Sequence, residues 1–125
     1  MSPDARNEVE HGHGAPGCTV IRAGASRAFM EGDEACREYV RTPSFWMGTS
    51  RLPPGTAGDL DPGHADHAEM FLVISGSASI STGHTIYELD EGDALFIPPT
   101  IPHTLRNDGA AEAVLVWAAG LSREP

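Results

Sequence analysis

The sequence predicts one small all-β domain, built as a sandwich or a barrel of short strands. Seven or eight runs rich in β-branched and aromatic residues recur at near-regular spacing, and turns rich in Gly and Pro separate them. No alternation of strands with helices occurs, which disfavours a parallel sheet. The length of 125 residues suits a single domain, and a chain of this size can bury a hydrophobic core without disulfides.

Residues 1–17 are predicted to form a disordered or extended N-terminal tail, because Gly, Pro, Asn and acidic residues leave little to bury. His11 and His13 lie in this tail, where no surrounding residues fix an imidazole, and we expect them to be solvated. The single domain is predicted to span 18–125. No run approaches the ~20 apolar residues that cross a bilayer, and the N-terminus has no apolar run typical of a secretory signal, so we expect a cytoplasmic location.

Strands are assigned along the chain from these runs and turns. A first short strand is expected at 18–23, whereas 31–41 is ambiguous between helical turns and an irregular lead into a strand. Asp-Pro-Gly at 61–63 and Asn-Asp-Gly at 107–109 are typical turn sequences. The remaining strands are predicted at 44–52, 69–75, 77–81, 84–89, 94–97, 103–106 and 113–119.

The charge balance restricts the partners. With 18 acidic and 8 basic residues the net charge is −10, which disfavours nucleic acid and anionic membranes because both require Lys and Arg. Cys18 and Cys36 are too few for a disulfide framework, and we expect free thiols.

Candidate metal ligands concentrate in two segments. The first reads GDLDPGHADHAEMFLVISG and the second GDALFIPPTIPHTLRN. Alternate residues of a strand face the same side, so Glu69 shares a face with Phe71, and with His67 if the strand begins there. A hairpin after His64 would bring this residue to Glu69 from a neighbouring strand, and His103 must arrive from a sequence-distant strand.

Histidine combined with carboxylate is a ligand set that suits one divalent transition metal ion, namely Fe, Mn, Ni, Zn or Cu. Two His and one carboxylate form the facial triad of oxygen-activating iron sites. The expected centre therefore follows from residue type and spacing.

The two segments resemble the signature motifs of the cupin family, G-x5-H-x-H-x(3,4)-E-x6-G and G-x5-P-x-G-x2-H-x3-N. The first motif is matched in its second half by Glu69 and Gly76. The second is matched at Gly92, Pro98, His103 and Asn107, with Thr100 in place of Gly. This resemblance covers residues 40–119. It implies a cupin double-stranded β-helix, that is, a jelly-roll barrel with a metal ion in its mouth.

The paired histidines of the first motif are incomplete in this chain. If His64 is the second histidine, Pro62 occupies the first position; if Gly58 makes His64 the first histidine, Asp66 takes the second position. Because His67 can share the face of Glu69, it is a candidate to replace the missing histidine. The predicted metal ligands are His64, His67, Glu69 and His103, with Asp61 and Asp66 in reserve.

Glu69 is also the predicted catalytic residue, either as a ligand or as an acid of the pocket. Phe71 and Leu105 are expected to line the pocket, because they share the faces of Glu69 and His103. Trp46 and Arg51 are further candidates on the strand 44–52. Alternation places these two residues on opposite faces, and the sequence leaves open which face points inward.

These residues predict a metal-dependent small-molecule enzyme with isomerase, cyclase or dioxygenase chemistry. The segment GHADHAEMF is also similar to part of the cupin-type phosphoglucose isomerases. The alternative is a non-catalytic ligand-binding or sensing module. The expected partners are a small-molecule substrate and a second copy of the chain, because an exposed sheet edge and the apolar strand 113–119 favour a homodimer.

Overall fold

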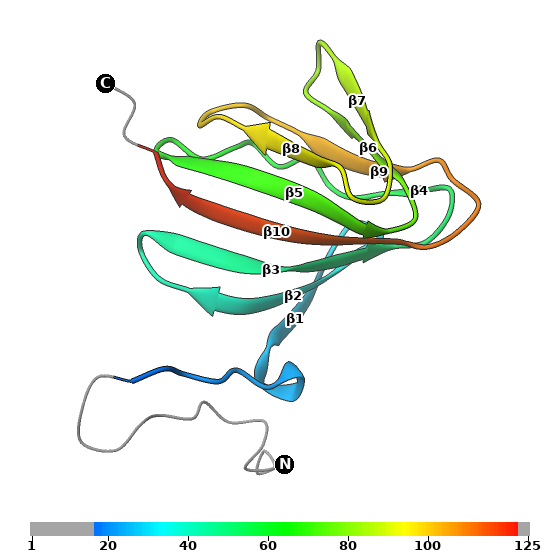
Figure 1. The fold of residues 1–125 in the computed structure, drawn as a ribbon. Coiled ribbons are helices and arrows are strands. Elements are labelled where there is room, and N and C mark those ends of the chain that lie inside the picture. The colour runs from blue at the N-terminus through cyan, green and yellow to red at the C-terminus, as the bar shows by residue number, and fades with distance from the viewer. Residues whose placement is uncertain (1–16, 123–125) are drawn as a thin grey trace.

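The computed structural model describes residues 17–122 and shows two antiparallel sheets that enclose one core (Figure 1). The six-stranded sheet has the order β1-β2-β3-β10-β5-β8, and the four-stranded sheet has the order β4-β9-β6-β7. The strands are β1 (Arg27–Glu31), β2 (Glu34–Arg41), β3 (Phe45–Leu52), β4 (Thr56–Ala57), β5 (His67–Ser75), β6 (Ala78–Ser81), β7 (Ile86–Leu89), β8 (Ala94–Ile97), β9 (Thr104–Asn107) and β10 (Ala113–Leu121). The predicted all-β jelly-roll barrel is confirmed.

The N-terminal part of the domain differs from the sequence prediction. The strand expected at 18–23 is wrong, because this stretch shows only a bridge at Val20 before a short 3-10 helix, Ala23–Ala25. The ambiguous stretch 31–41 belongs to a hairpin of β1 and β2, whose turn contains Gly32 at a φ of 61°. The predicted tail, including His11 and His13, lies almost wholly outside the described residues, and the predicted domain limits of 18–125 stay a prediction.

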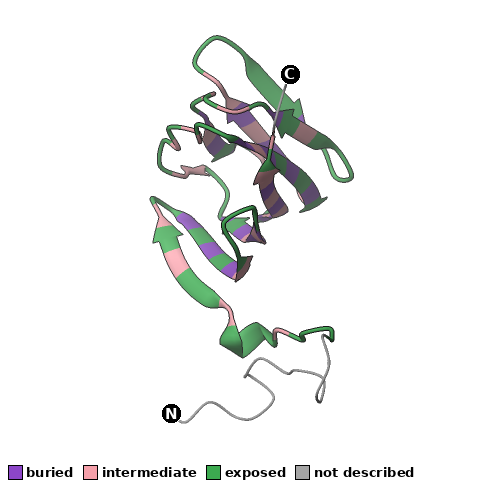
Figure 2. Cartoon of the chain, turned by 90° about the vertical axis from the view of Figure 1, so that its left-hand side faces the viewer, coloured by how far each residue is buried: buried purple, intermediate pink, exposed green. Residues whose placement is uncertain are grey.

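The core lies between the two sheets, and strand alternation fills it. Figure 2 shows buried and exposed residues alternating along the strands, as expected for sheets with one face turned inward. Leu52, Ile80 and Leu115 are fully buried, and they come from β3, β6 and β10. The barrel therefore has a close-packed apolar interior at the end where these strands meet.

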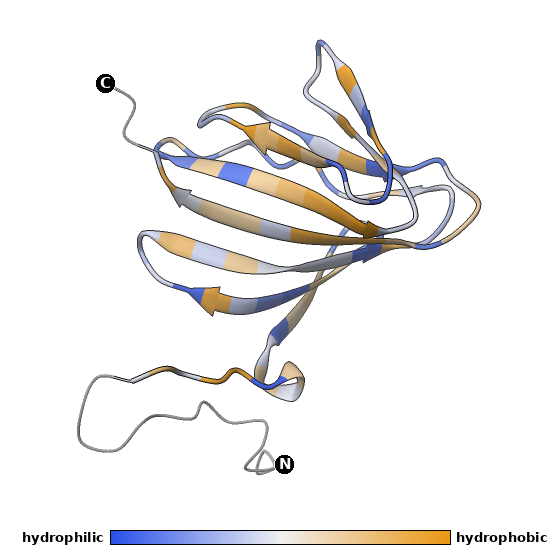
Figure 3. Cartoon of the chain, in the orientation of Figure 1, coloured by the Kyte–Doolittle hydropathy of each residue, from blue (hydrophilic) through white to orange (hydrophobic). Residues whose placement is uncertain are grey.

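The inner face of the six-stranded sheet is unusually polar along β1 and β2. Glu34, Cys36 and Glu38 are buried on alternate positions of β2. Figure 3 shows β2 as largely hydrophilic, in contrast to the more hydrophobic β5, β8 and β10. A buried carboxylate is costly unless it is paired or hydrogen-bonded. This wall consequently indicates a polar cavity inside the barrel.

The described part of the chain includes no helix that is long and apolar enough to cross a membrane.

Candidate metal centre

The centre is built where the end of the larger sheet meets the loop that precedes β9. Glu69 points inward from β5, and His103 lies immediately before β9; their exposed fractions are 7% and 2%. Asp61 reaches them from the loop after β4, because a β-bridge joins it to His103. In this bridge each amide nitrogen donates to the other residue's carbonyl oxygen at 2.8 Å. Backbone pairing thus fixes two residues that are far apart in sequence.

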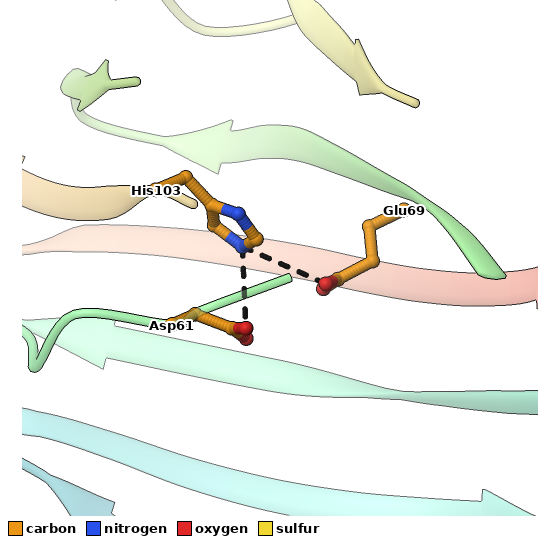
Figure 4. Close-up of side chains that lie close together, drawn as sticks. All are labelled: Asp61, Glu69 and His103. Atoms are coloured by element: carbon orange, nitrogen blue, oxygen red, sulfur yellow. Dashed lines mark ion pairs between the residues drawn. The ribbon is translucent and has the colours of Figure 1, made fainter. Parts of the chain in front are cut away.

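The side chains of these three residues converge, as Figure 4 shows. His103 Nε2 lies 3.6 Å from Glu69 Oε1 and 3.6 Å from Asp61 Oδ2. One potential ligand atom from each residue lies within 4.8 Å of the other two. The group combines one imidazole with two carboxylates, a donor set that suits a divalent transition metal.

Two atoms of this group have no hydrogen-bond partner although both are buried, namely Glu69 Oε1 and His103 Nε2. His103 Nδ1 lies 3.0 Å from the carbonyl oxygen of Ile101. Because a carbonyl only accepts, Nδ1 donates, and in the neutral ring Nε2 keeps its lone pair. That lone pair then faces the carboxyl groups of Asp61 and Glu69, each 3.6 Å away and beyond hydrogen-bonding distance. A cation satisfies all three groups, so the residues present fit a metal ion.

Burial and neighbouring charge act together on Glu69. Desolvation, together with the nearby carboxyl groups of Asp61, Glu31 and Glu34, raises the pKa of its carboxyl to about 8. Without a cation, this carboxyl consequently holds a proton near neutral pH. A divalent ion would take the place of that proton.

His64 lies beside the group, as the sequence predicted. Its Nε2 is 3.3 Å from Glu69 Oε1, and its carbonyl oxygen accepts a hydrogen bond of 2.8 Å from the amide of Thr100. The approach comes from a loop and not from the predicted hairpin. Gly63 permits this turn, because it has a φ of 83° and a Cβ there would lie 2.9 Å from the carbonyl oxygen of Ile101.

His67 shares the inward face of Glu69 but is engaged elsewhere. Its Nδ1 lies 2.7 Å from Asp66 Oδ1, and its Nε2 lies 3.0 Å from the carbonyl oxygen of Pro43. The ring also stacks on Trp46, with the centroids 4.3 Å apart. Both nitrogens therefore face oxygens of Asp66 and Pro43, not the group around His103. The structure therefore brings neither His67 nor the reserve candidate Asp66 into the group of Asp61, Glu69 and His103.

A cavity of about 140 Å³ lies in front of this group. Trp46, Phe71 and Leu105 line it, as expected from the sequence. Arg51 does not line it, and this expectation needs correction. Alternation on β3 turns Trp46 inward and Arg51 outward, where its guanidinium pairs with Glu112 at 2.9 Å.

The opposite cavity wall carries a buried acid that sequence reasoning missed. Glu34 Oε2 accepts hydrogen bonds from Ser50 Oγ and from Cys36 Sγ, and Trp117 Nε1 donates to the same Ser50 oxygen at 2.9 Å. Burial raises the pKa of the Glu34 carboxyl. The same burial raises the pKa of the Cys36 thiol to about 12, which makes it a weak nucleophile. Both cysteines are free thiols, as predicted.

Arginine lies on the same wall, farther along β1 and β2. Arg41 makes two hydrogen bonds to the Glu38 carboxylate, at 2.9 and 2.8 Å, and Arg27 lies 3.5 Å from it. These arginines lower the pKa of Glu38. Six carboxyl groups and two guanidinium groups therefore line the cavity. The sequence indicates this wall by placing Glu34, Cys36 and Glu38 at alternate positions, so that they share one face of a strand.

The fold and this centre define a barrel with a candidate metal site in its interior, and comparison with known families assigns the class. Residues 48–119 match the family described as Cupin domain. Because this match covers more than half of the chain, the protein belongs to the cupin family, which confirms the resemblance seen in the sequence.

Known structures share the fold at low sequence identity. The Cnp3 cupin domain of Schizosaccharomyces pombe superposes with a TM-score of 0.70 at 13% identity, covering 86% of this chain and 80% of that one. A predicted oxalate decarboxylase of Thermotoga maritima gives 0.66 at 16% identity, covering 82% and 99%. At these identities the likeness shows the fold alone.

A curated relative matches over a shorter stretch. The mannose-1-phosphate guanylyltransferase of Salmonella muenchen is 36% identical over 53 residues, which are 42% of this chain. This match spans only 11% of the length of the relative.

Proposed function

We propose that this cupin binds one divalent transition metal ion through His103 and Glu69, with Asp61 and His64 beside them, for use on a small molecule. The observation that carries the proposal is the pair of buried, unpartnered atoms, Glu69 Oε1 and His103 Nε2, 3.6 Å apart. Buried polar atoms without a hydrogen-bond partner are rare and costly in a folded protein. Fe, Mn, Ni, Zn and Cu are all compatible with imidazole and carboxylate donors.

When bound, the ion would supply Lewis acidity or oxygen activation. The protein's own residues would position and protonate the small molecule. Glu69 is the proposed catalytic residue, as a ligand of the ion, because its Oε1 lies 3.3 Å from His64 Nε2 and 3.6 Å from His103 Nε2. Glu34 keeps a second buried acid on the opposite wall.

The charges of the cavity favour a neutral or weakly charged small molecule. Six carboxyl groups face only two guanidinium groups there, so the cavity holds an excess of acidic over basic groups. A phosphate ester would meet Glu31, Glu34 and Asp59 beside the proposed metal ligands. We therefore propose that this chain does not share the phosphorylated sugar named for its Salmonella relative. Isomerase, cyclase and dioxygenase chemistry remain the proposed reaction classes, and the cytoplasm the proposed location.

The proposal is tested by measuring metal content. Purified protein is reconstituted with Fe(II), Mn(II), Ni(II) or Zn(II) and analysed by inductively coupled plasma mass spectrometry. We expect one ion per chain in the wild type, and loss of that ion in His103→Gln. His84→Gln is the matched control, because His84 is exposed on the surface. A wild type that holds no metal after reconstitution contradicts the proposal.

The second candidate is a non-catalytic sensing module. It is favoured by the reduced first motif, in which His67 is engaged with Asp66 and Pro43 and does not face the other ligands. The two functions differ in turnover. A metal-loaded protein that gains thermal stability from a small molecule without converting it would support sensing, whereas metal-dependent product formation would support the enzyme.

A further inference from the structure

His64 and His103 differ in how their imidazole rings are held. His103 Nδ1 donates to the carbonyl oxygen of Ile101, which fixes the orientation of that ring. His64 lies in the loop between β4 and β5 with its side chain 35% exposed, and its Nε2 reaches Glu69 Oε1 at 3.3 Å. Within residues 17–122, its Nδ1 makes no hydrogen bond. A histidine that binds a metal usually gains its orientation from such a bond, so His64 requires another support.

The indole ring of Trp46 lies directly against His64 and can provide this support. The two ring centroids are 4.9 Å apart at an interplanar angle of 72°, which is an edge-to-face contact. Trp46 is 8% exposed and points inward from β3. Ala119 of β10 pairs with Trp46 on one side and with Glu69 on the other. The small side chain of Ala119 leaves room for the indole to extend from β3 toward the metal centre.

Two further side chains hold the indole in place. From β2, the guanidinium carbon of Arg41 lies 4.4 Å from the ring centroid, and Glu38 fixes this guanidinium with two hydrogen bonds. From β5, the ring of His67 stacks on the indole with the centroids 4.3 Å apart. His67 is itself held at both nitrogens, by Asp66 and by the carbonyl oxygen of Pro43. Because β3 and β10 lie between β2 and β5 in the sheet, the two contacts come from opposite directions.

We propose that Trp46 is a positioning residue that holds His64 as a ligand of the metal ion, and that His67 supports Trp46 by stacking instead of binding the ion. The inference rests on the proposed function, because it requires an ion at His103 and Glu69. Contact with the indole restricts rotation of the His64 imidazole, as the backbone hydrogen bond does for His103. Without the indole, His64 is a loop residue whose ring can turn away from Glu69 into solvent.

The test counts the imidazoles bound to Cu(II) by electron spin echo envelope modulation. The chain has six histidines, and His11→Gln, His13→Gln and His84→Gln are introduced throughout, so that the parent protein keeps only His64, His67 and His103. Two bound imidazoles are expected in the parent protein, those of His64 and His103. Trp46→Ala should show one. Its affinity for Zn(II), measured by competition with a chelator, should fall about 10–100-fold, as when a residue that orients a metal ligand is removed.

Two variants control for a general effect on the cavity. Phe29→Ala removes another aromatic ring of the cavity wall, which also has a guanidinium against it, that of Arg27 at 4.3 Å from the centroid. Phe29→Ala should keep two bound imidazoles and the Zn(II) affinity of the parent protein. Trp46→Phe restores an aromatic ring at the critical position and should also keep two bound imidazoles.

Variants of His67 separate support from metal binding, and they test the inference even if Trp46→Ala does not fold, as judged by circular dichroism. His67→Ala removes the stacked ring and should lose one bound imidazole, whereas His67→Phe keeps a ring without nitrogen and should retain two. Two imidazoles at unchanged affinity in Trp46→Ala or in His67→Ala overturn the inference, and so does a single imidazole in His67→Phe. A parent protein that binds Cu(II) through one imidazole overturns the inference alone, whereas one that binds no ion also overturns the proposed function.

Discussion

His103 lies immediately before β9, and Asn107 is the last residue of that strand. Both are almost fully buried, but they differ in their hydrogen bonding. Asn107 has all its hydrogen bonds: its Nδ2 donates to the carbonyl oxygens of Leu52 and Ala111 at 2.8 Å each, and its Oδ1 accepts from the amide of Gly109 at 2.9 Å. His103 Nε2 has no partner. The comparison teaches that a satisfied buried polar group holds a fold together, whereas an unsatisfied one marks a place for a ligand.

The first prediction concerns removal of the Asn107 side chain. Asn107→Ala removes three hydrogen bonds and leaves two carbonyl groups and one amide unpaired. We expect the free energy of unfolding to fall by about 3 kcal/mol, because three hydrogen bonds are lost and the buried carbonyl of Leu52 is left unpaired. Urea denaturation measures this loss. The control is Asp108→Ala, which removes an exposed ion pair with Arg106 and should cost little. A loss below about 1 kcal/mol for Asn107→Ala would contradict the structural role of this residue.

The second prediction concerns pH and Glu69, which faces His103 from β5. Burial raises the pKa of Glu69 to about 8 in the folded, metal-free protein. The folded state therefore binds a proton that the unfolded state releases near its ordinary pKa of about 4.3. The free energy of unfolding of the metal-free protein should fall as pH rises between these values, by about 1.4 kcal/mol for each pH unit.

Glu69→Gln is the test variant for that pH dependence, because it cannot lose a proton. Its pH dependence of unfolding, followed by chemical denaturation, should be flatter than that of the wild type. Part of the dependence should remain, since burial also raises the pKa of Glu34. Identical pH profiles for the two proteins would show that the pKa of Glu69 is not raised in the folded protein.

The smallest change in stability is expected at Thr100, three residues before His103. This residue has a φ of 71°, which a β-branched side chain rarely adopts, and it stands where the cupin motif has Gly. Thr100→Gly should stabilise the protein by about 0.5–1 kcal/mol, because relief of strain exceeds the entropy cost of Gly. Differential scanning calorimetry measures the change. Thr104→Gly, in the adjacent regular strand, should instead destabilise; stabilisation by both variants would refute local strain.

The sequence predicted the parts of the centre that lie on regular strands. Glu69 and Phe71 follow from the period of two along β5, and His103 and Asn107 from one compact motif. His64 was also placed correctly near Glu69, although by a loop. Regular alternation and short spacing were sufficient in these cases, because local geometry alone decides which side chains share a face.

Longer-range features could not be predicted in the same way. Asp61 is part of an Asp-Pro-Gly turn, and only its bridge to His103 brings it to the centre. The inward face of β3 was undecided, because Phe45, Trp46 and Met47 are all apolar. The buried Glu34 violates the expectation that charges face water, and its hydrogen bonds to Ser50 and Cys36 depend on the pairing of β2 with β3.

The position of a bound ion would test directly whether His103 and Glu69 bind the metal. Crystals of protein reconstituted with Zn(II) or Fe(II) would be measured at the absorption edge of the metal, so that anomalous scattering locates the ion. We predict a peak about 2.0–2.3 Å from His103 Nε2 and from a carboxylate oxygen of Glu69, the range for nitrogen and oxygen ligands. A fully loaded protein whose ion lies away from both residues would contradict the account.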